Sequence, residues 1–126
     1  MPNKTIFSII ESPLHPNLSS LYRRLGFEEI RPRSVRDALK QIKKHQPAYI
    51  VADFFYAYGS NYSGVHISNL DVLFVSLQKY SIDTQVIVFA QKDETQYIEK
   101  FCSMFPVYKS FIYPVTAQQI EKALTR

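Results

Sequence analysis

The chain has 126 residues, 46% of them hydrophobic and 21% charged, with a formal net charge of +4. This length and composition predict one globular domain over residues 1–126, large enough to fold without a disulfide or a structural metal. The single cysteine, Cys102, excludes an internal disulfide and favours a reducing compartment. The first apolar run is too short for a signal peptide or a membrane span, so we expect a cytoplasmic protein.

The first half of the chain predicts three strands and two helices in alternation. Residues 5–10 have the β-branched and aromatic content of a buried strand, and residues 18–25 carry apolar side chains at helical spacing. Residues 29–33 predict a weak strand whose proline suits only a sheet edge. A second helix follows over 35–42, and an apolar third strand, 48–53, ends at an aspartate.

The second half repeats this alternation. Residues 85–90 and 110–113 predict the fourth and fifth strands. Helical spacing of apolar residues predicts helices over 70–77, 93–102 and 116–124.

Five strands that alternate with helices indicate an α/β fold with a parallel sheet covered on both faces. Right-handed crossovers leave few possible topologies. The proline in the second strand, Pro32, places that strand at an edge, which favours the order 2-1-3-4-5. In this order the first and third strands end side by side, which brings Glu11 and Asp53 to one edge of the sheet.

The chain resembles, over nearly its full length, the receiver domain of two-component response regulators. The resemblance rests on five strand-and-helix units of the right size, on Glu11 after the first strand, on Asp53 at the end of the third, and on the aromatic-Pro-Val step at 113–115. It implies the flavodoxin-like (βα)5 receiver fold and a cis peptide bond before Pro114.

The resemblance also implies a site. In that family the acids after the first strand and the aspartate of the third strand hold a divalent cation, and the aspartate accepts a phosphoryl group. Asp53 is therefore the candidate phosphoacceptor, and Glu11 with Asp53 are the candidate Mg²⁺ ligands. Ser12 stands where the family has a second acid. Mg²⁺ is usually held by one or two carboxylates with water and phosphate oxygens, so these two residues supply only the minimum. No other cofactor is expected.

Two further positions differ from the family. Phe89 stands at the place of a hydroxyl residue, and Tyr113 at the place of a lysine. Phosphoryl transfer depends on cations opposite the developing charge, so the missing lysine matters most. Lys92, just past the fourth strand, is the candidate for a compensating cation. These differences predict a degenerate receiver that signals by binding.

A loop crowded with aromatic residues follows Asp53. Its tyrosines, Tyr56, Tyr58 and Tyr62, lie among glycine, serine and asparagine, the composition of an exposed loop. Tyrosine in such surroundings is typical of binding surfaces, because it offers a large contact area at little cost in side-chain entropy. We expect these tyrosines to contact a protein partner.

Eight of the fifteen basic residues fall between Arg23 and Lys44. Such a cluster could attract nucleic acid or a membrane surface, or it could be a solvated helix face. Phe27 is the only aromatic residue inside the segment, so base-stacking platforms are scarce and nucleic acid is not the expected partner.

The sequence thus predicts a receiver-like, non-enzymatic module of two-component signalling. Its expected partner is a histidine kinase, an output protein or a second copy of the chain. The alternatives are a working phosphoacceptor, with Asp53 modified by a histidine kinase, and a nucleic-acid or membrane-surface binder that uses residues 23–44.

Overall fold

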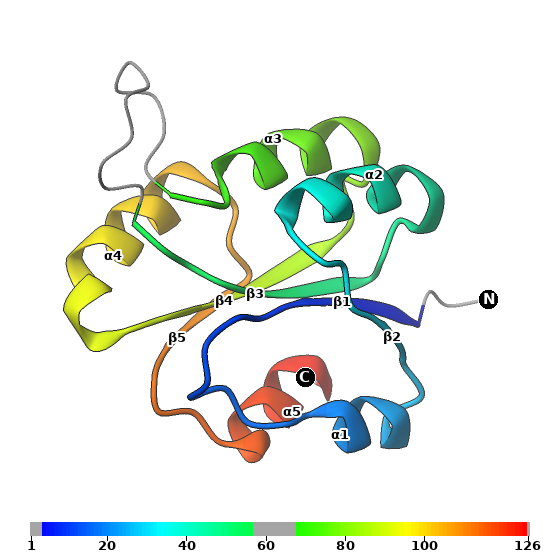
Figure 1. The fold of residues 1–126 in the computed structure, drawn as a ribbon, viewed down its shortest axis with the longest axis horizontal. Coiled ribbons are helices and arrows are strands. Elements are labelled where there is room, and N and C mark those ends of the chain that lie inside the picture. Colours follow the sequence, from blue (N-terminus) through cyan, green and yellow to red (C-terminus); the bar gives the residue numbers. More distant parts are fainter. Residues whose placement is uncertain (1–3, 57–67, 126) are drawn as a thin grey trace.

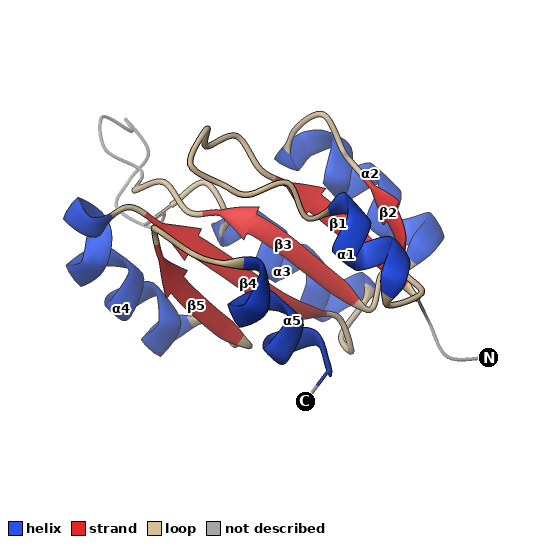
Figure 2. Cartoon of the chain, turned by 90° about the horizontal axis from the view of Figure 1, so that it is seen from below, coloured by secondary structure: helices blue, strands red, loops and turns tan. Residues whose placement is uncertain are grey.

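The computed structural model describes residues 4–56 and 68–125. Its centre is a five-stranded parallel sheet in the order β2-β1-β3-β4-β5, the order that the edge proline predicted (Figures 1 and 2). The strands are β1 (Thr5–Ile9), β2 (Glu28–Ile30), β3 (Tyr49–Asp53), β4 (Gln85–Ala90) and β5 (Lys109–Ile112).

Helices cover both faces of the sheet (Figure 1). One face carries α1 (Ser19–Arg24) and α5 (Ala117–Thr125). The other carries α2 (Val35–His45), α3 (Asp71–Tyr80) and α4 (Thr95–Met104), the last of which follows a short 3-10 turn, η1 (Lys92–Glu94). None of the helices in the described part of the chain is long and apolar enough to cross a membrane.

Each face of the sheet has its own apolar core. Under α2, α3 and α4 the core includes Phe7, Ile50, Phe74 and Phe101, and under α1 and α5 a second core is built around Tyr22 and other rings. The inner strands are buried on both faces, which is why they read as continuous apolar runs in the sequence.

Polar side chains set the helix boundaries. The amide of Asp37 donates to the Ser34 hydroxyl at 3.1 Å, which caps the start of α2. At the start of α3 the hydroxyl and amide of Ser68 both donate to the buried carboxylate of Asp71. At the start of α5 the Gln119 backbone amide donates to the Thr116 hydroxyl.

Several boundaries differ by one or more residues from the sequence-based expectation. The second strand is shorter, and Pro32 lies beyond its end, so this proline never has to fit a ladder of hydrogen bonds. The fifth strand begins and ends one residue earlier, which leaves Tyr113 just past its carboxyl end. The fourth helix is preceded by the η1 turn. The Tyr113–Pro114 peptide bond is cis, as the resemblance implies.

Candidate functional site

Asp53 is the last residue of β3, at the carboxyl edge of the sheet between β1 and β4. Its side chain is buried, with 2% of the residue exposed. Carboxylate Oδ2 accepts two hydrogen bonds of 2.7 Å, from the backbone N–H groups of Glu11 and Ser12. Hydrogen bonds to an ionised acceptor are among the stronger ones in proteins, so the loop after β1 is fastened to this oxygen.

The other carboxylate oxygen of Asp53 accepts a hydrogen bond from a side chain just past the end of β5, which lies two strands away from β3 in the sheet. Tyr113, 3% exposed, donates its hydroxyl hydrogen to Oδ1 of Asp53 at 2.6 Å. The tyrosine ring stacks on Phe89, with 5.8 Å between the ring centroids. Burial, and then the hydrogen bond to Asp53, raise the pKa of Tyr113, so the phenol stays protonated and remains a donor.

His15 continues this chain of contacts. Its Nδ1 lies 3.0 Å from the Tyr113 oxygen. Because the phenol hydrogen points to Asp53, the tyrosine oxygen can only accept here, and we therefore assign the hydrogen to Nδ1 of His15. Burial lowers the pKa of His15 more than the charges of Asp53 and Glu29 raise it, which favours the neutral ring. The ring stands edge-on against Phe89, at 4.7 Å between centroids.

The two candidate cation ligands differ in their surroundings: Asp53 is buried and Glu11 is exposed. Glu11 is exposed, and the group that it brings to Asp53 is its backbone N–H. Ser12 likewise reaches Asp53 through its backbone, while its hydroxyl accepts from the Leu14 amide. Within ranges 4–56 and 68–125, no group of three or more His, Cys, Asp or Glu side chains could hold a metal ion.

Lys92, the candidate for a compensating cation, lies just past β4, as the sequence predicts. Lys92 begins η1 and is exposed, and in the described part of the chain it makes no hydrogen bond or ion pair with Asp53. The residue that stands in place of the family's lysine, Tyr113, contacts the carboxylate itself. A neutral donor thus occupies the position of a cation.

The aromatic segment after Asp53 is anchored by polar contacts. Asn69 donates to the Asp53 carbonyl oxygen at 2.9 Å and accepts from the Phe55 amide at 2.7 Å. Phe54 is buried and stands edge-on against Phe101 of α4, in the core cluster that also contains Phe74 of α3.

Tyr56 is half-buried and stacks on Tyr97 of α4, with 3.9 Å between ring centroids. Its amide donates to the Glu94 carboxylate at 2.9 Å. One face of the Tyr56 ring is therefore covered by Tyr97 within the domain. Tyr58 and Tyr62 lie outside the described residues.

The basic segment does not form one surface. Arg23 and Arg24 lie on α1, and Arg36, Lys40 and Lys43 lie on α2, on the opposite face of the sheet (Figure 1). Arg24 forms a 3.2 Å ion pair with Glu121 of α5. The crossover from α1 through β2 to α2 therefore separates charges that are close in the sequence.

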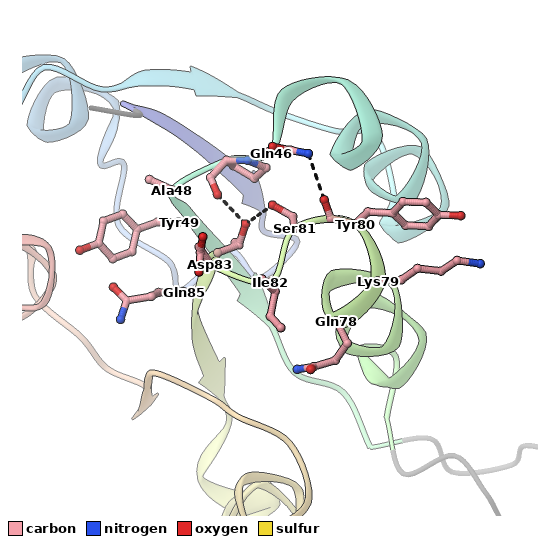
Figure 3. Close-up of a pocket in the computed structure, with 12 residues that line it drawn as sticks. Gln46, Ala48, Tyr49, Gln78, Lys79, Tyr80, Ser81, Ile82, Asp83 and Gln85 are labelled. Atoms are coloured by element: carbon pink, nitrogen blue, oxygen red, sulfur yellow. Dashed lines mark hydrogen bonds between the residues drawn. The ribbon is translucent and has the colours of Figure 1, made fainter. Parts of the chain in front are cut away.

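A wide hollow of about 660 Å³ lies at the opposite, amino edge of the sheet (Figure 3). It is crossed by hydrogen bonds from Gln46 to the Tyr80 carbonyl at 3.2 Å and between the hydroxyls of Ser81 and Thr84 at 2.6 Å. Its polar groups are thus largely engaged with one another, and it shares no lining residue with the Asp53 site.

Sequence reasoning missed two members of the site. Asn69 shows only as a polar residue before a helix, and His15 only as an isolated histidine in a proline-rich loop. The signal that could have found His15 is its place, four residues beyond Glu11, since loops at the carboxyl ends of parallel strands converge.

A five-stranded parallel sheet in this order, with a buried aspartate closing β3, is the receiver fold of two-component response regulators. No family model matches the sequence, and no curated protein matches it either. The comparison with solved structures supplies the likeness. A response regulator receiver domain from Clostridium thermocellum superposes with a TM-score of 0.72 at 17% identity, over 98% of this chain and 91% of that one.

Two further solved structures show the same fold. A response regulator from Burkholderia multivorans has a TM-score of 0.68 at 13% identity, over 98% of this chain and 93% of that one. A response regulator from Burkholderia pseudomallei, whose structure contains a phosphorylated aspartic acid, a calcium ion and citrate, has a TM-score of 0.61 at 16% identity, over 98% and 67%. These likenesses confirm the expected fold.

Proposed function

We propose that this chain is a degenerate receiver of a two-component or phosphorelay system, which acts by binding a protein partner and not by accepting a phosphoryl group. The proposal rests on the hydrogen bonds that the Asp53 carboxylate accepts. Both of its oxygens accept hydrogen bonds from within the domain, two at Oδ2 and one at Oδ1.

Phosphoryl transfer to an aspartate would need one carboxylate oxygen to attack phosphorus while the bond from phosphorus to the donor breaks. It also needs cations near the transferred group. In this chain Oδ1 of Asp53 accepts a hydrogen bond from the Tyr113 hydroxyl, and the Tyr113 ring stacks on the ring of Phe89. Attack of Oδ1 on phosphorus would therefore require the Tyr113 hydroxyl to give up its hydrogen bond to Asp53. No lysine among the described residues forms a hydrogen bond with Asp53 that could replace it.

Incubation with Mg²⁺ and acetyl phosphate, followed by intact-mass measurement, tests the first half of the proposal. We expect no added phosphate on the wild-type chain and no difference from Asp53→Asn. A phosphate mass that disappears in Asp53→Asn would instead support the alternative, a working phosphoacceptor served by a histidine kinase. We retain that alternative because Asp53 lies at the end of β3.

The partner surface in this proposal is the aromatic segment that contains Tyr56, Tyr58 and Tyr62, and the partner is a kinase, an output protein or a second copy. Sedimentation velocity over a range of concentrations tests the second copy. Because Tyr56 also stacks on Tyr97, the clean variant is Tyr58→Ala with Tyr62→Ala. We expect any dimer to be weakened in this variant while the thermal midpoint stays nearly constant. A dimer that persists unchanged would place the contact elsewhere.

A further inference from the structure

The helices α2 and α3 lie side by side on one face of the sheet, and their outer sides carry different side chains (Figure 1). The outer side of α3 carries two exposed valines, Val72 with 44% and Val75 with 63% of the residue exposed. Single apolar residues at a surface are normal, but these two are one helical turn apart and lie beside a basic helix. The exposed cations of α2 are Arg36, Lys40, Lys43 and Lys44.

A contact between the two helices shows which side of α2 faces α3. The Lys43 ammonium of α2 lies over the Tyr80 ring at the end of α3, with 4.9 Å between the nitrogen and the ring centroid. Residues three and seven positions before Lys43 lie on the same side of a helix, so Lys40 and Arg36 also face α3. Three cations therefore form a row along the α3 side of α2.

The two valines lie level with this row. Both helices connect parallel strands, so they run in the same direction. Arg36, seven residues before Lys43, is therefore level with the first turn of α3, which contains Val72. Val72, Val75 and Lys79 follow one another at helical spacing and share the outer side of α3. The α2–α3 surface consists of these two rows, Arg36, Lys40 and Lys43 on one side and Val72, Val75 and Lys79 on the other.

The cations of the α2–α3 surface have no carboxylate partner among the described residues. The ion pairs that those residues form involve neither α2 nor α3. Instead, Lys43 and Lys79 both lie over one ring, that of Tyr80, at 4.9 and 5.3 Å from its centroid. Two like charges beside one ring repel each other, and a carboxylate between them would be attracted by both.

The acidic side chains closest in the sequence do not neutralise these cations. Asp37 accepts hydrogen bonds at the start of α2, and Asp71 is buried at the start of α3, where it also accepts. Figure 3 shows the Lys79 and Tyr80 side chains pointing away from Asp83. The α2–α3 surface is therefore positively charged.

Cations on one side and methyl groups on the other suit an amphipathic helix with an acidic edge. Such a helix lays its apolar side on an apolar surface, and the next residues around it meet the neighbouring charges. Helices that lie on membranes bury Trp, Phe or Leu, whereas the α2–α3 surface exposes valines. Nucleic acids are bound through their phosphates and through stacking on rings, and the valines add nothing to either.

We propose that the α2–α3 surface binds an acidic amphipathic helix of a partner protein. The apolar side of that helix lies on Val72 and Val75, and its carboxylates lie along the cations of α2. One carboxylate lies between Lys43 and Lys79, beside the Tyr80 ring. Neither Asp53 nor the tyrosines of the aromatic segment take part, so this binding is separate from the proposed function.

Amide-resolved NMR titration of the full chain with a designed helical peptide tests this proposal. The peptide has about 18 residues, or about five turns, with leucines along one side, glutamates beside them and alanines elsewhere. Two matched peptides replace the glutamates by glutamines or the leucines by alanines. At about 0.05 M salt we expect the acidic peptide to give saturable shifts at Lys40, Val75 and Lys79 with a submillimolar dissociation constant. Each matched peptide should bind at least about tenfold more weakly.

Several outcomes of this titration would overturn the proposal. They are the absence of saturable shifts, equal binding of the glutamine peptide, and larger shifts at Arg23 and Arg24 on the opposite face of the sheet. Cosedimentation with phosphatidylserine vesicles, or saturation of the same amides by oligothymidine at a lower concentration than by the acidic peptide, would assign the surface to a membrane or to nucleic acid instead.

Lys40→Gln with Lys43→Gln removes two charges of the row. This double variant should weaken binding of the acidic peptide about three- to tenfold, the effect of two exposed ion pairs. Arg23→Gln with Lys100→Gln is the matched control, because it removes the same charge from exposed positions on α1 and α4. The control should bind within about twofold of the wild type, since distant charges are screened. Equal losses in the two double variants would mean that net charge, and not this surface, attracts the peptide.

Val75→Ser tests the apolar side. It should weaken binding of the acidic peptide about three- to tenfold, because two methyl groups leave the contact. The thermal midpoint should stay within about 2 °C of the wild type, because the side chain is exposed. Wild-type affinity in Val75→Ser would show that the valines take no part and would reduce the surface to a row of charges.

Discussion

Tyr113→Phe isolates the hydroxyl that the chain places on Asp53. The variant keeps the ring that stacks on Phe89 and deletes a 2.6 Å hydrogen bond to a buried carboxylate together with the 3.0 Å contact to His15. A hydrogen bond to a charged group contributes about 1.5–3 kcal/mol and a neutral one about 0.5–1.5 kcal/mol. Because the two backbone donors to Oδ2 remain, we expect the free energy of unfolding to fall by about 2–4 kcal/mol.

Thermal unfolding followed by circular dichroism measures this loss. For a domain of this size about 1 kcal/mol corresponds to about 4 °C, so the midpoint should fall by about 8–15 °C. Tyr108→Phe, which loses one neutral hydrogen bond to Ala123, should fall by only about 2–6 °C. If Tyr113→Phe loses no more than Tyr108→Phe, the Tyr113 hydroxyl does not hold a charged Asp53 and the basis of the proposed function is wrong.

Two other expectations follow from the same site. Because burial lowers the pKa of His15, the unfolded chain binds its proton at a higher pH than the folded chain does. The stability from neutral His15 is therefore present above about pH 6.5 and is lost as the pH falls through the lowered value. Thermal midpoints between about pH 7 and pH 5 should fall less steeply in His15→Asn, and equal slopes would contradict this. Asn69→Ala deletes the bonds to the Asp53 carbonyl and from the Phe55 amide, and should lower the midpoint by about 4–11 °C. An unchanged midpoint in Asn69→Ala would mean that these two bonds contribute little to stability.

The fold could be predicted from the sequence because it rests on repeated, local signals. Apolar runs at 48–53 and 85–90 are long enough to indicate strands buried on both faces. The edge position of the second strand was predicted from Pro32, although this proline lies beyond the end of β2. Boundaries were less predictable. The third helix begins at Asp71, within one residue of the predicted 70–77, but continues to Tyr80, beyond the last apolar residue of the predicted stripe.

The site was only partly predictable. The sequence identified Asp53 by its place at the end of a strand, and Tyr113 as the residue in place of a lysine. It read Tyr113 as a lost cation, whereas the structure makes it a hydrogen-bond donor to Asp53. The amides of Glu11 and Ser12 could not be predicted, because every residue has one and only the turn after β1 decides where it points.

The contacts on either side of residues 57–67 bear on how this part of the chain can vary. Tyr56 and Ser68 form an isolated antiparallel bridge, and Asn69 ties Phe55 to the end of β3. Tyr56 and Ser68, which flank residues 57–67, are thus held next to each other by described residues. Since the entropy of closing a loop grows only slowly with its length, an insertion between these two points should cost the domain little stability. The position suits the transplantation of a foreign epitope or a second small domain.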